Sequence, residues 1–189
     1  MKIRPANPDD LKKLIELEMI IIDSMETKLY QKLGAEKSKD LLYEASELDP
    51  VGRYNYKRAI VAQEKDEIVG IVYGFPSEDE KIVNIKLDQI TQEKYNTNDQ
   101  FFPDQESIGD EWYLDSLVVD PKFQGKGIGS LLLKSLPKIV KSTGKTLIGL
   151  NVDDFNPRAK KLYLKSGFHE VNRIKIGSHN YSHMQYQIK

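Results

Sequence analysis

The sequence of 189 residues contains no cysteine, which excludes disulfides, zinc–thiolate and iron–sulfur sites, and a cysteine nucleophile. Histidine is scarce as well. His179 and His183 are four residues apart, but they fall on a predicted turn and strand and not on one helix face, so we expect no metal site. The string G-x-S-x-G of many serine hydrolases is also missing. A covalent intermediate on the protein therefore lacks a candidate nucleophile.

Long apolar runs are missing too. The first ten residues, MKIRPANPDD, contain no hydrophobic signal region, and the apolar stretch at residues 14–22 is interrupted by Glu16 and Glu18. An excess of charge is lacking, because 28 basic residues nearly balance 29 acidic ones. The sequence thus predicts a cytoplasmic protein with neither a membrane nor a nucleic acid as its partner.

What is present is the composition of one globular domain, with 39% hydrophobic and 30% charged residues. Polarity patterns predict strands at residues 2–5, 59–63, 68–75, 112–119, 146–152, 171–176 and 181–188. Helices are predicted at residues 38–48 and 130–141, and two further helices are predicted to begin at the capping pairs Asn7-Pro8 and Asn156-Pro157. Residues 82–87 fit a strand or a helix start, and residues 96–110 are predicted as a loop. This order indicates an α/β (α+β) fold with helices on a mixed sheet.

The strand at residues 112–119 leads into a glycine-rich loop, Gln124-Gly125-Lys126-Gly127-Ile128-Gly129, and then into a helix. Glycines let the backbone approach a ligand, and the unpaired N–H groups and dipole at a helix N-terminus favour an anion. Such a loop suits a pyrophosphate. The string is neither a Walker P-loop nor the dinucleotide fingerprint G-x-G-x-x-G. A tightly packed turn without a ligand is the alternative.

Two motifs here resemble the GNAT superfamily of N-acetyltransferases. Gln124, Gly127 and Gly129 fill its cofactor motif Q/R-x-x-G-x-G/A, after a segment, Leu117-Val118-Val119-Asp120-Pro121, that resembles the family's fourth strand and its exit. The later pattern N-x-x-A-x-x-x-Y-x-x-x-G-F is matched by Asn156, Ala159, Tyr163, Gly167 and Phe168.

The resemblance implies one domain over residues 1–189 with a mixed, mostly antiparallel sheet of about seven strands and about four helices. Its cofactor-binding core is expected at about residues 112–170. Elements on the acceptor side are expected at about residues 8–50 and 77–110. These acceptor-side parts are the least constrained by the two motifs, so the sequence does not identify the acceptor.

The resemblance also implies acetyl-CoA as co-substrate, with no metal. In the family, N–H groups of the glycine loop bind the pyrophosphate, and the backbone of the fourth strand pairs with the pantetheine arm. These roles carry over to Gln124, Gly125, Lys126, Gly127, Ile128, Gly129 and Ser130 for the loop, and to Leu117, Val118 and Val119 for the strand. Asn156 is the implied side-chain contact to the pantetheine arm, and capping the helix from Pro157 is its other predicted role.

Tyr163 is the general acid that the resemblance implies. After an amine attacks the thioester, the departing CoA thiolate benefits from a proton. A phenol with a pKa of about 10 is protonated at neutral pH and can supply that proton. Leu162 and Leu164 flank this tyrosine, so a core position on an amphipathic helix is the alternative interpretation.

The general base is less well specified. If the strand is regular, its period of two places Glu111, Tyr113, Asp115, Leu117 and Val119 on one face, which makes Asp115 and Glu111 candidates. In the family's histone-type enzymes the catalytic glutamate aligns with Tyr113 instead, so that role does not carry over directly. Asp115 is interpreted either as the base or as a carboxylate that orients the substrate.

The leading hypothesis is direct acetyl transfer to a primary amine of a small molecule or peptide in a ternary complex. The alternatives are a non-catalytic acyl-CoA sensor or partner-binding module, and an acyltransferase for longer acyl groups or oxygen acceptors. Residues 99–120 hold seven carboxylates and no Lys or Arg, whereas residues 122–165 hold ten basic residues and two carboxylates. The acidic segment would attract a cationic amine, and the basic segment would attract anionic CoA. The alternative interpretation is that both segments are solvent-exposed surface. A homodimer is compatible with these features.

Overall fold

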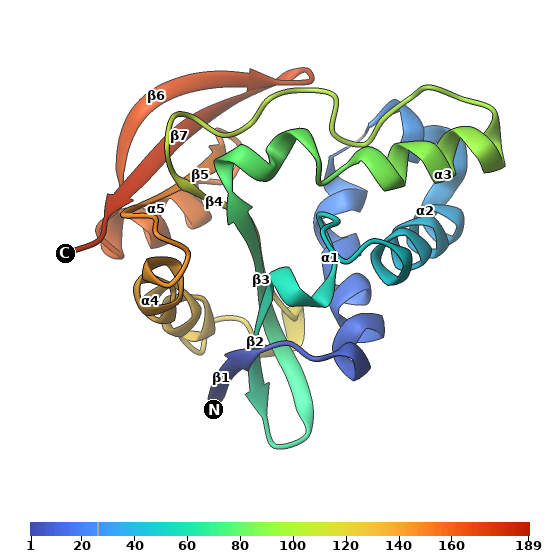
Figure 1. The fold of residues 1–189 in the computed structure, drawn as a ribbon. Coiled ribbons are helices and arrows are strands. Elements are labelled where there is room, and N and C mark those ends of the chain that lie inside the picture. The colour runs from blue at the N-terminus through green and yellow to red at the C-terminus, as the bar shows by residue number, and fades with distance from the viewer. Residues whose placement is uncertain (26) are drawn as a thin grey trace.

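The computed structural model describes residues 1–25 and 27–189. Within these residues, seven strands form one sheet in the order β1-β2-β3-β4-β5-β7-β6 (Figure 1). Neighbouring strands are antiparallel except β4 and β5, which are parallel. The strands are β1 (Lys2–Pro5), β2 (Ala59–Glu64), β3 (Glu67–Pro76), β4 (Trp112–Val119), β5 (Leu147–Asp153), β6 (His169–Ile176) and β7 (His179–Gln187). The predicted mixed, mostly antiparallel sheet is confirmed.

Five α-helices in the described part of the chain flank the sheet, where about four were expected. They are α1 (Leu11–Ser24), α2 (Lys28–Leu48), α3 (Ile85–Tyr95), α4 (Ile128–Lys141) and α5 (Pro157–Lys165). Figure 1 shows α1, α2 and α3 on one side of the central strands, and α4 and α5 on the other. α3 begins within residues 82–87, which confirms a helix start there and excludes the alternative strand. α2 begins ten residues before the predicted start at residue 38. Gly34, which has non-helical backbone angles, separates its first turns from the rest of the helix.

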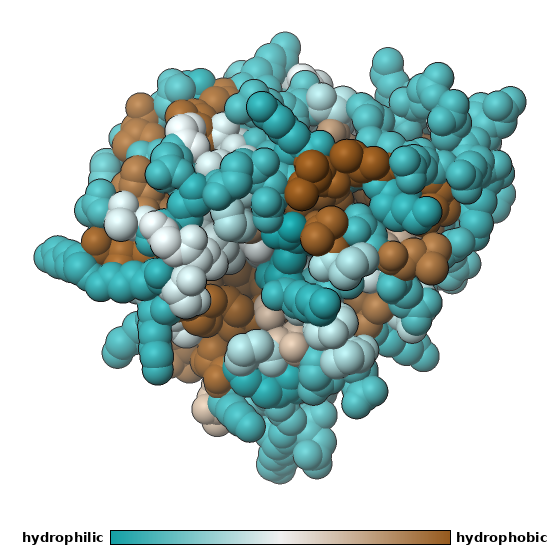
Figure 2. Space-filling view, in the orientation of Figure 1, coloured by the Kyte–Doolittle hydropathy of each residue, from teal (hydrophilic) through white to brown (hydrophobic). Residues whose placement is uncertain are grey.

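Each face of the sheet carries its own hydrophobic core. On one face, Leu14 and Ile22 of the predicted apolar stripe of α1 are fully buried in a cluster that includes Tyr73 of β3. On the other face, Val72 of β3 packs in a cluster with Leu132 of α4. Figure 2 shows a mainly hydrophilic surface with apolar side chains gathered in small patches. No helix among the described residues has the length and apolar character needed to cross a membrane.

β4 contains a β-bulge at Asp115. In its register with β3, Gly74 pairs with Leu114 and Tyr73 pairs with Ser116, so Asp115 has no residue opposite it. An extra residue in one strand interrupts the period of two and turns the following side chains to the other face. The bulge therefore decides which side chains of β4 reach each core.

The prediction that Asp115, Leu117 and Val119 share one face is wrong for this reason. Leu114 and Leu117 lie on opposite faces of a regular strand, yet both pack against the core that includes α4. Val119 packs there too, whereas Val118 packs against the core that includes α1. Asp115 is thereby separated from the side chains of Leu117 and Val119, although it stays next to them along the chain.

β4 and β5 pair through only two positions, Trp112 with Ile148 and Tyr113 with Gly149. Beyond Tyr113, β4 is hydrogen-bonded to β3 alone among the described strands. Parallel strands that stop pairing leave backbone groups of both strands without a partner strand. The space between the two strands is thus available for a ligand.

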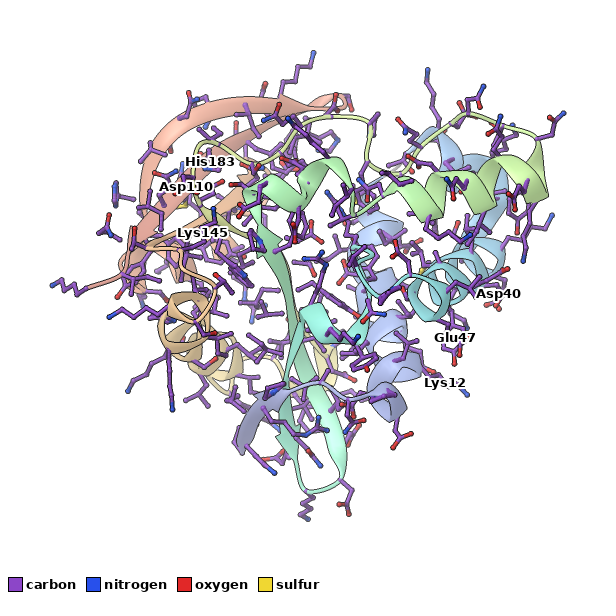
Figure 3. All side chains as sticks on the ribbon, viewed as in Figure 1. Lys12, Asp40, Glu47, Asp110, Lys145 and His183 are labelled. Carbon is purple, nitrogen blue, oxygen red and sulfur yellow. The ribbon has the colours of Figure 1, made fainter. Side chains whose placement is uncertain are left out.

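The buried side chain of Glu111 anchors this joint. Its Oε1 accepts a hydrogen bond from the backbone N–H of Ile108 at 2.8 Å, and its Oε2 accepts one from Gln185 Nε2 at 2.9 Å. The ring Nε2 of His183 lies 3.1 Å from the same Oε2. Figure 3 labels His183 in this part of the molecule, on β7. A buried carboxylate needs such partners, because an unsatisfied charge is costly in the protein interior.

We expect Gly149→Ala to lower the free energy of unfolding by about 3 kcal/mol, as overpacking of a tight site does. A Cβ atom at Gly149 would lie 1.8 Å from Glu111 Oε2, and Glu111 cannot move away without losing its hydrogen bonds. Urea unfolding followed by circular dichroism measures the loss. Gly70→Ala is the control and should cost less, because its Cβ would meet the Ile128 side chain at 3.1 Å and the Val118 carbonyl at 3.2 Å, and not a carboxylate at 1.8 Å. Equal losses in both variants would contradict this packing.

Candidate active site

A cavity of about 220 Å³ lies between β4 and β5 beyond their two shared pairs. Its polar and aromatic lining comes from segments far apart in the sequence: Glu18, Arg53, Tyr54, Phe102, Glu106, Tyr113, Asp115, Ser116, Asn151, Asp153, Asn156, Tyr163 and Tyr181. Phe102 and Glu106 belong to the loop that runs from α3 to β4, in yellow-green in Figure 1. The cavity is therefore bordered by helices from both layers, α1 and α5, and by this loop.

A groove of about 420 Å³ follows the glycine loop. Its lining residues are Leu117, Val119, Gln124, Gly125, Gly127, Ile128, Gly129, Ser130, Asn156, Arg158, Ala159 and Leu162. Leu117, Asn156 and Ala159 line the cavity as well, so the groove and the cavity adjoin at these residues. The structure thus brings most of the predicted cofactor contacts together in one continuous hollow.

Two of the predicted contacts lie differently. Val118 turns its side chain into the core on the α1 side, so only its backbone faces the strand edge. The Lys126 ammonium group lies over the ring of Phe123, with 4.7 Å between its Nζ and the ring centroid. Neither side chain lines the groove in this arrangement.

The glycine loop ends in a sharp turn at the start of α4. Gly127 has φ 80°, in the left-handed region where a side chain is strained, and its carbonyl accepts the N–H of Leu131 at 3.1 Å. The N–H groups of Ile128, Gly129 and Ser130 therefore come before the first helical hydrogen bond. Such groups are available to an anion, and the helix dipole favours negative charge there.

The Gln124 side chain connects the loop to its surroundings. Its Nε2 donates to the carbonyl of Val119 at 3.1 Å, and its Oε1 accepts a hydrogen bond from Arg158 Nη1 at 3.2 Å. Arg158 thereby places a permanent cation beside the groove, a role that the sequence motifs did not indicate. Asn156 caps α5 as predicted, because its Oδ1 accepts the N–H of Ala159 at 3.0 Å, and it also lines both hollows.

Tyr163 lies on α5 with its ring buried and packed edge-to-face against Phe168, with 5.9 Å between the ring centroids. It lines the cavity, so the two predicted roles, core residue and candidate acid, fall on the same side chain. Burial raises the pKa of Tyr163 to about 12. The phenol is therefore fully protonated at neutral pH.

A buried guanidinium organises the acidic side of the cavity. Nη1 of Arg53 lies 3.1 Å from Oδ1 of Asp115 and 3.4 Å from Oε1 of Glu106. The Arg53 guanidinium also stacks on Phe102, 3.9 Å from the ring centroid. Glu106 accepts a further hydrogen bond from the Tyr113 hydroxyl at 2.9 Å. Asp115 thus reaches the cavity, as predicted for a candidate base, but as the partner of an arginine.

A second carboxylate, Glu18 of α1, lies on the same side of the cavity. Its Oε2 accepts a hydrogen bond from the Ser116 hydroxyl at 2.7 Å. Burial, with the nearby charge of Asp115, raises the pKa of Glu18 to about 8. Burial likewise raises the pKa of Asp115 to about 7, against the opposing effect of Arg53. Both acids therefore titrate near neutral pH.

Glu111, the other candidate base, does not line the cavity. Its carboxylate is occupied by Ile108, Gln185 and His183 at the joint of β4 and β5. The sequence missed Glu18, although it lies four residues from both Leu14 and Ile22, on the buried stripe of α1. A carboxylate on such a stripe is a signal of a special role. No comparable signal marks Arg53.

The sequence profile of the Acetyltransferase (GNAT) family matches residues 22–168 of the chain. The chain therefore belongs to the GNAT family of acetyltransferases. A crystal structure described only as that of an acetyltransferase is 38% identical, covers 100% of both chains and superposes with a TM-score of 0.87. The crystal structure of an N-acetyltransferase from Staphylococcus aureus Mu50 is 27% identical over 98% of this chain and 100% of that chain, with a TM-score of 0.85.

Two further similarities are narrower. A thialysine N-epsilon-acetyltransferase from Bos taurus is 34% identical over 59 residues, which are 31% of this chain and 35% of that protein. The chain thus aligns with about a third of that relative. The structure of yncA from Salmonella typhimurium with its cofactor acetyl-CoA is 19% identical over 100% of this chain and 94% of that chain, with a TM-score of 0.60, and shares the fold.

We expect the thermal midpoint of the protein to fall as the pH rises from about 5 to about 8. The pKa values of Glu18 and Asp115 are raised in the folded state, so folding binds protons that the unfolded chain has already released in this range. The stability that these two groups contribute is fully present below the pKa values of the unfolded chain. It is lost as the pH rises through the folded-state values of about 7 and about 8. Glu18→Gln should make the pH dependence shallower, and parallel curves for the two proteins would contradict the assignment.

Proposed function

We propose that the protein transfers an acetyl group from acetyl-CoA directly to a primary amine. The proposal rests on one observation: the groove along the glycine loop and the cavity between β4 and β5 adjoin at Leu117, and their linings differ in charge. The groove offers helix N–H groups and a cation to an anionic ligand, whereas the charged side chains that line the cavity are four acids and one arginine. A cosubstrate and an amine that enter from opposite sides would meet at this junction.

The groove suits the two polar parts of acetyl-CoA. The pyrophosphate fits the N–H groups of Ile128, Gly129 and Ser130, with Arg158 beside them. A Cβ atom at Gly127 would have no atom within 4 Å, so the entrance is open. The pantetheine arm is an extended chain with amide groups. It can pair with Leu117, Val118 and Val119 of β4, which have β3 on one side and no β5 partner on the other among the described pairs.

The yncA structure, which has the same fold and contains acetyl-CoA, supports acetyl-CoA as the cosubstrate. When bound, acetyl-CoA supplies an acetyl thioester that is activated toward amines. The chain contributes no cysteine, and it contains no G-x-S-x-G motif, which favours transfer in a ternary complex over a covalent relay. The residues of the cavity then need only to orient the amine and move protons.

The proton balance assigns separate roles to the cavity residues. An ammonium group must lose one proton before its nitrogen can attack the acetyl carbon. When the C–S bond breaks, the Tyr163 hydroxyl gives its proton to the thiolate. The nitrogen of the new amide then gives its remaining extra proton to the Tyr163 phenolate, which restores the phenol. Asp115, paired with Arg53, is a carboxylate beside the incoming ammonium, and Glu111 takes no part because it is enclosed elsewhere.

The chemistry of the cavity supports an amine as the acceptor. Glu18, Glu106, Asp115 and Asp153 line it, and Arg53 is the single basic side chain among its described lining residues. Excess negative charge attracts a cationic substrate and disfavours an anionic one. The Bos taurus relative, named for acetylation of an amine, agrees with this class over the segment that aligns.

Gly127→Asp should weaken acetyl-CoA binding by about 100-fold or more, because like charges brought together cost several kcal/mol. Calorimetric titration with acetyl-CoA measures the effect. The matched control is Gly144→Asp, since Gly144 has nearly the same φ, 83° against 80°, and equally open surroundings, but lies outside the groove. Normal binding by Gly127→Asp, or equal loss in both variants, would remove the loop from the pyrophosphate site.

Tyr163→Phe should lower kcat by about 10²- to 10⁴-fold, the usual range for a general acid, and leave the affinity for acetyl-CoA unchanged. Release of the CoA thiol with a panel of primary amines reports the rate. Tyr186→Phe is the control, because Tyr186 also packs on Phe168 but lines neither the cavity nor the groove.

Unchanged turnover by Tyr163→Phe would take the acid role from this residue. A wild-type protein that binds acetyl-CoA but acetylates no amine in the panel would overturn the proposed transfer. That outcome would favour a non-catalytic sensor on the same fold.

A further inference from the structure

Burial of the Glu18 carboxylate costs folding free energy. It lies between Leu14 and Ile22 on the buried face of α1, and none of its surface is exposed. An unpaired carboxylate is among the least favourable groups to bury, since desolvation opposes its charge. A nonpolar residue at this position would continue the apolar stripe and stabilise the helix packing. The presence of an acid here therefore calls for a role other than stability.

The surroundings of Glu18 leave half of its carboxylate free. Oε2 accepts the hydrogen bond of the Ser116 hydroxyl, whereas Oε1 makes no hydrogen bond with a described residue, although the Tyr54 hydroxyl lies close enough to the carboxylate to oppose the rise of its pKa. Glu18 lines the cavity, so Oε1 is a buried acceptor at a ligand-sized space. No three acidic or histidine side chains of the described chain are placed to hold a metal ion. The vacant acceptor suits an N–H donor.

The bulge in β4 places this acceptor at the junction of the two hollows. Because Asp115 is the extra residue, Ser116 turns toward α1 and reaches Glu18. Ser116 is adjacent to Leu117, which lines both the groove and the cavity. Glu18 is thus tied, through one hydrogen bond, to the residue before the junction where the proposed reaction occurs.

Asp115 is less suited to receive a cation. Its Oδ2 also lacks a hydrogen bond within the described part of the chain, but its Oδ1 is 3.1 Å from Arg53 Nη1, so the charge of this carboxylate already has a partner. Glu106 shares the same guanidinium and accepts the Tyr113 hydroxyl. By contrast, no Lys, Arg or His among the described residues forms an ion pair with Glu18. A ligand cation would therefore compensate Glu18 first.

On the basis of the proposed acetyl transfer, we propose that Glu18 binds the ammonium group of the acceptor and takes its proton. One N–H bond of the ammonium breaks and an O–H bond forms on the Glu18 carboxylate, which frees the nitrogen lone pair to attack the acetyl carbon. The proton then passes to solvent when the product leaves. The acceptor is accordingly an aliphatic primary amine, which is protonated at neutral pH like the lysine side chain, with a pKa of about 10.4.

The electrostatics around Glu18 agree with a proton acceptor. The groups that face it are Asp115 and Ser116 of β4, Tyr73 of β3, and Arg53 and Tyr54 of the segment after α2. Burial and the charge of Asp115 raise its pKa to about 8, closer to that of an ammonium, which makes it a stronger base than an ordinary glutamate. An ammonium bound at Oε1 would favour the ionised form of Glu18. Binding near pH 7, below the pKa of free Glu18, therefore releases the Glu18 proton to solvent.

The decisive experiment is calorimetric titration of the CoA-loaded protein with n-pentylamine at pH 7, in two buffers of different ionisation enthalpy. Wild type should bind n-pentylamine, but not 1-pentanol, with release of protons. Glu18→Gln keeps the shape and the acceptor for Ser116, yet should weaken binding about 10- to 100-fold and abolish proton release. Glu16→Gln, an exposed change on the same helix, is the matched control and should bind as wild type does.

Kinetics provide a second readout. With an amine that the protein acetylates, Glu18→Gln should lose about 10²- to 10⁴-fold in kcat/KM at pH 7, and its kcat/KM should rise only toward the pKa of the free ammonium, about 10.4 for a lysine-like amine. Glu18→Asp should keep the wild-type rise near neutral pH at a reduced rate. Wild-type rates in Glu18→Gln, or n-pentylamine binding independent of Glu18, would overturn the Glu18 assignment and leave acetyl transfer intact. Glu18-dependent binding without acetylation of any amine would overturn acetyl transfer and leave the ammonium site intact.

Discussion

β4 and β5 share two register pairs and then separate, and the rest of the site depends on that short pairing. The joint itself is tied by Glu111, whose buried carboxylate is satisfied by groups of the preceding loop and of β7. Past the joint, β4 keeps β3 as its partner on one side and leaves its other edge unpaired among the described strands. The cavity and the groove of the glycine loop both lie along that edge. A longer parallel pairing would close the space in which the two proposed substrates meet.

The acidic side of the cavity shows how function competes with stability in this fold. Glu18, Glu106 and Asp115 are buried around one guanidinium, that of Arg53, so their charges are only partly compensated. Desolvation raises the pKa values of Glu18 and Asp115 toward neutrality, which weakens the folded state as these groups ionise. The same perturbation leaves two proton acceptors poised near neutral pH beside the proposed reaction. Perturbed acids in a cavity are typical of functional sites.

Local patterns predicted much of the fold because they depend on neighbouring residues. Strands, caps and the glycine loop follow from periods of two, from Asn–Pro pairs and from glycines, all of which act within a few residues. The bulge at Asp115 could not be predicted in this way, since it arises from the register of β4 against β3. The start of α3 was one of two alternatives for residues 82–87, and its extent to Tyr95 was not predicted because the helix buries few apolar side chains and lies in a polar stretch. Both misses concern features that tertiary contacts decide.

The sequence by itself determined the family, the mixed sheet and the position of the glycine loop, because these rest on contiguous motifs. It also placed Tyr163 on a helix beside the loop. Only the tertiary structure decided which acids reach the cavity: Asp115 does so as the partner of Arg53, Glu111 is enclosed at the joint, and Glu18 arrives from a helix about 100 residues away. The physical reason is that a carboxylate's environment, its burial and its partners, is set by segments that meet only when the sheet and both helical layers have formed.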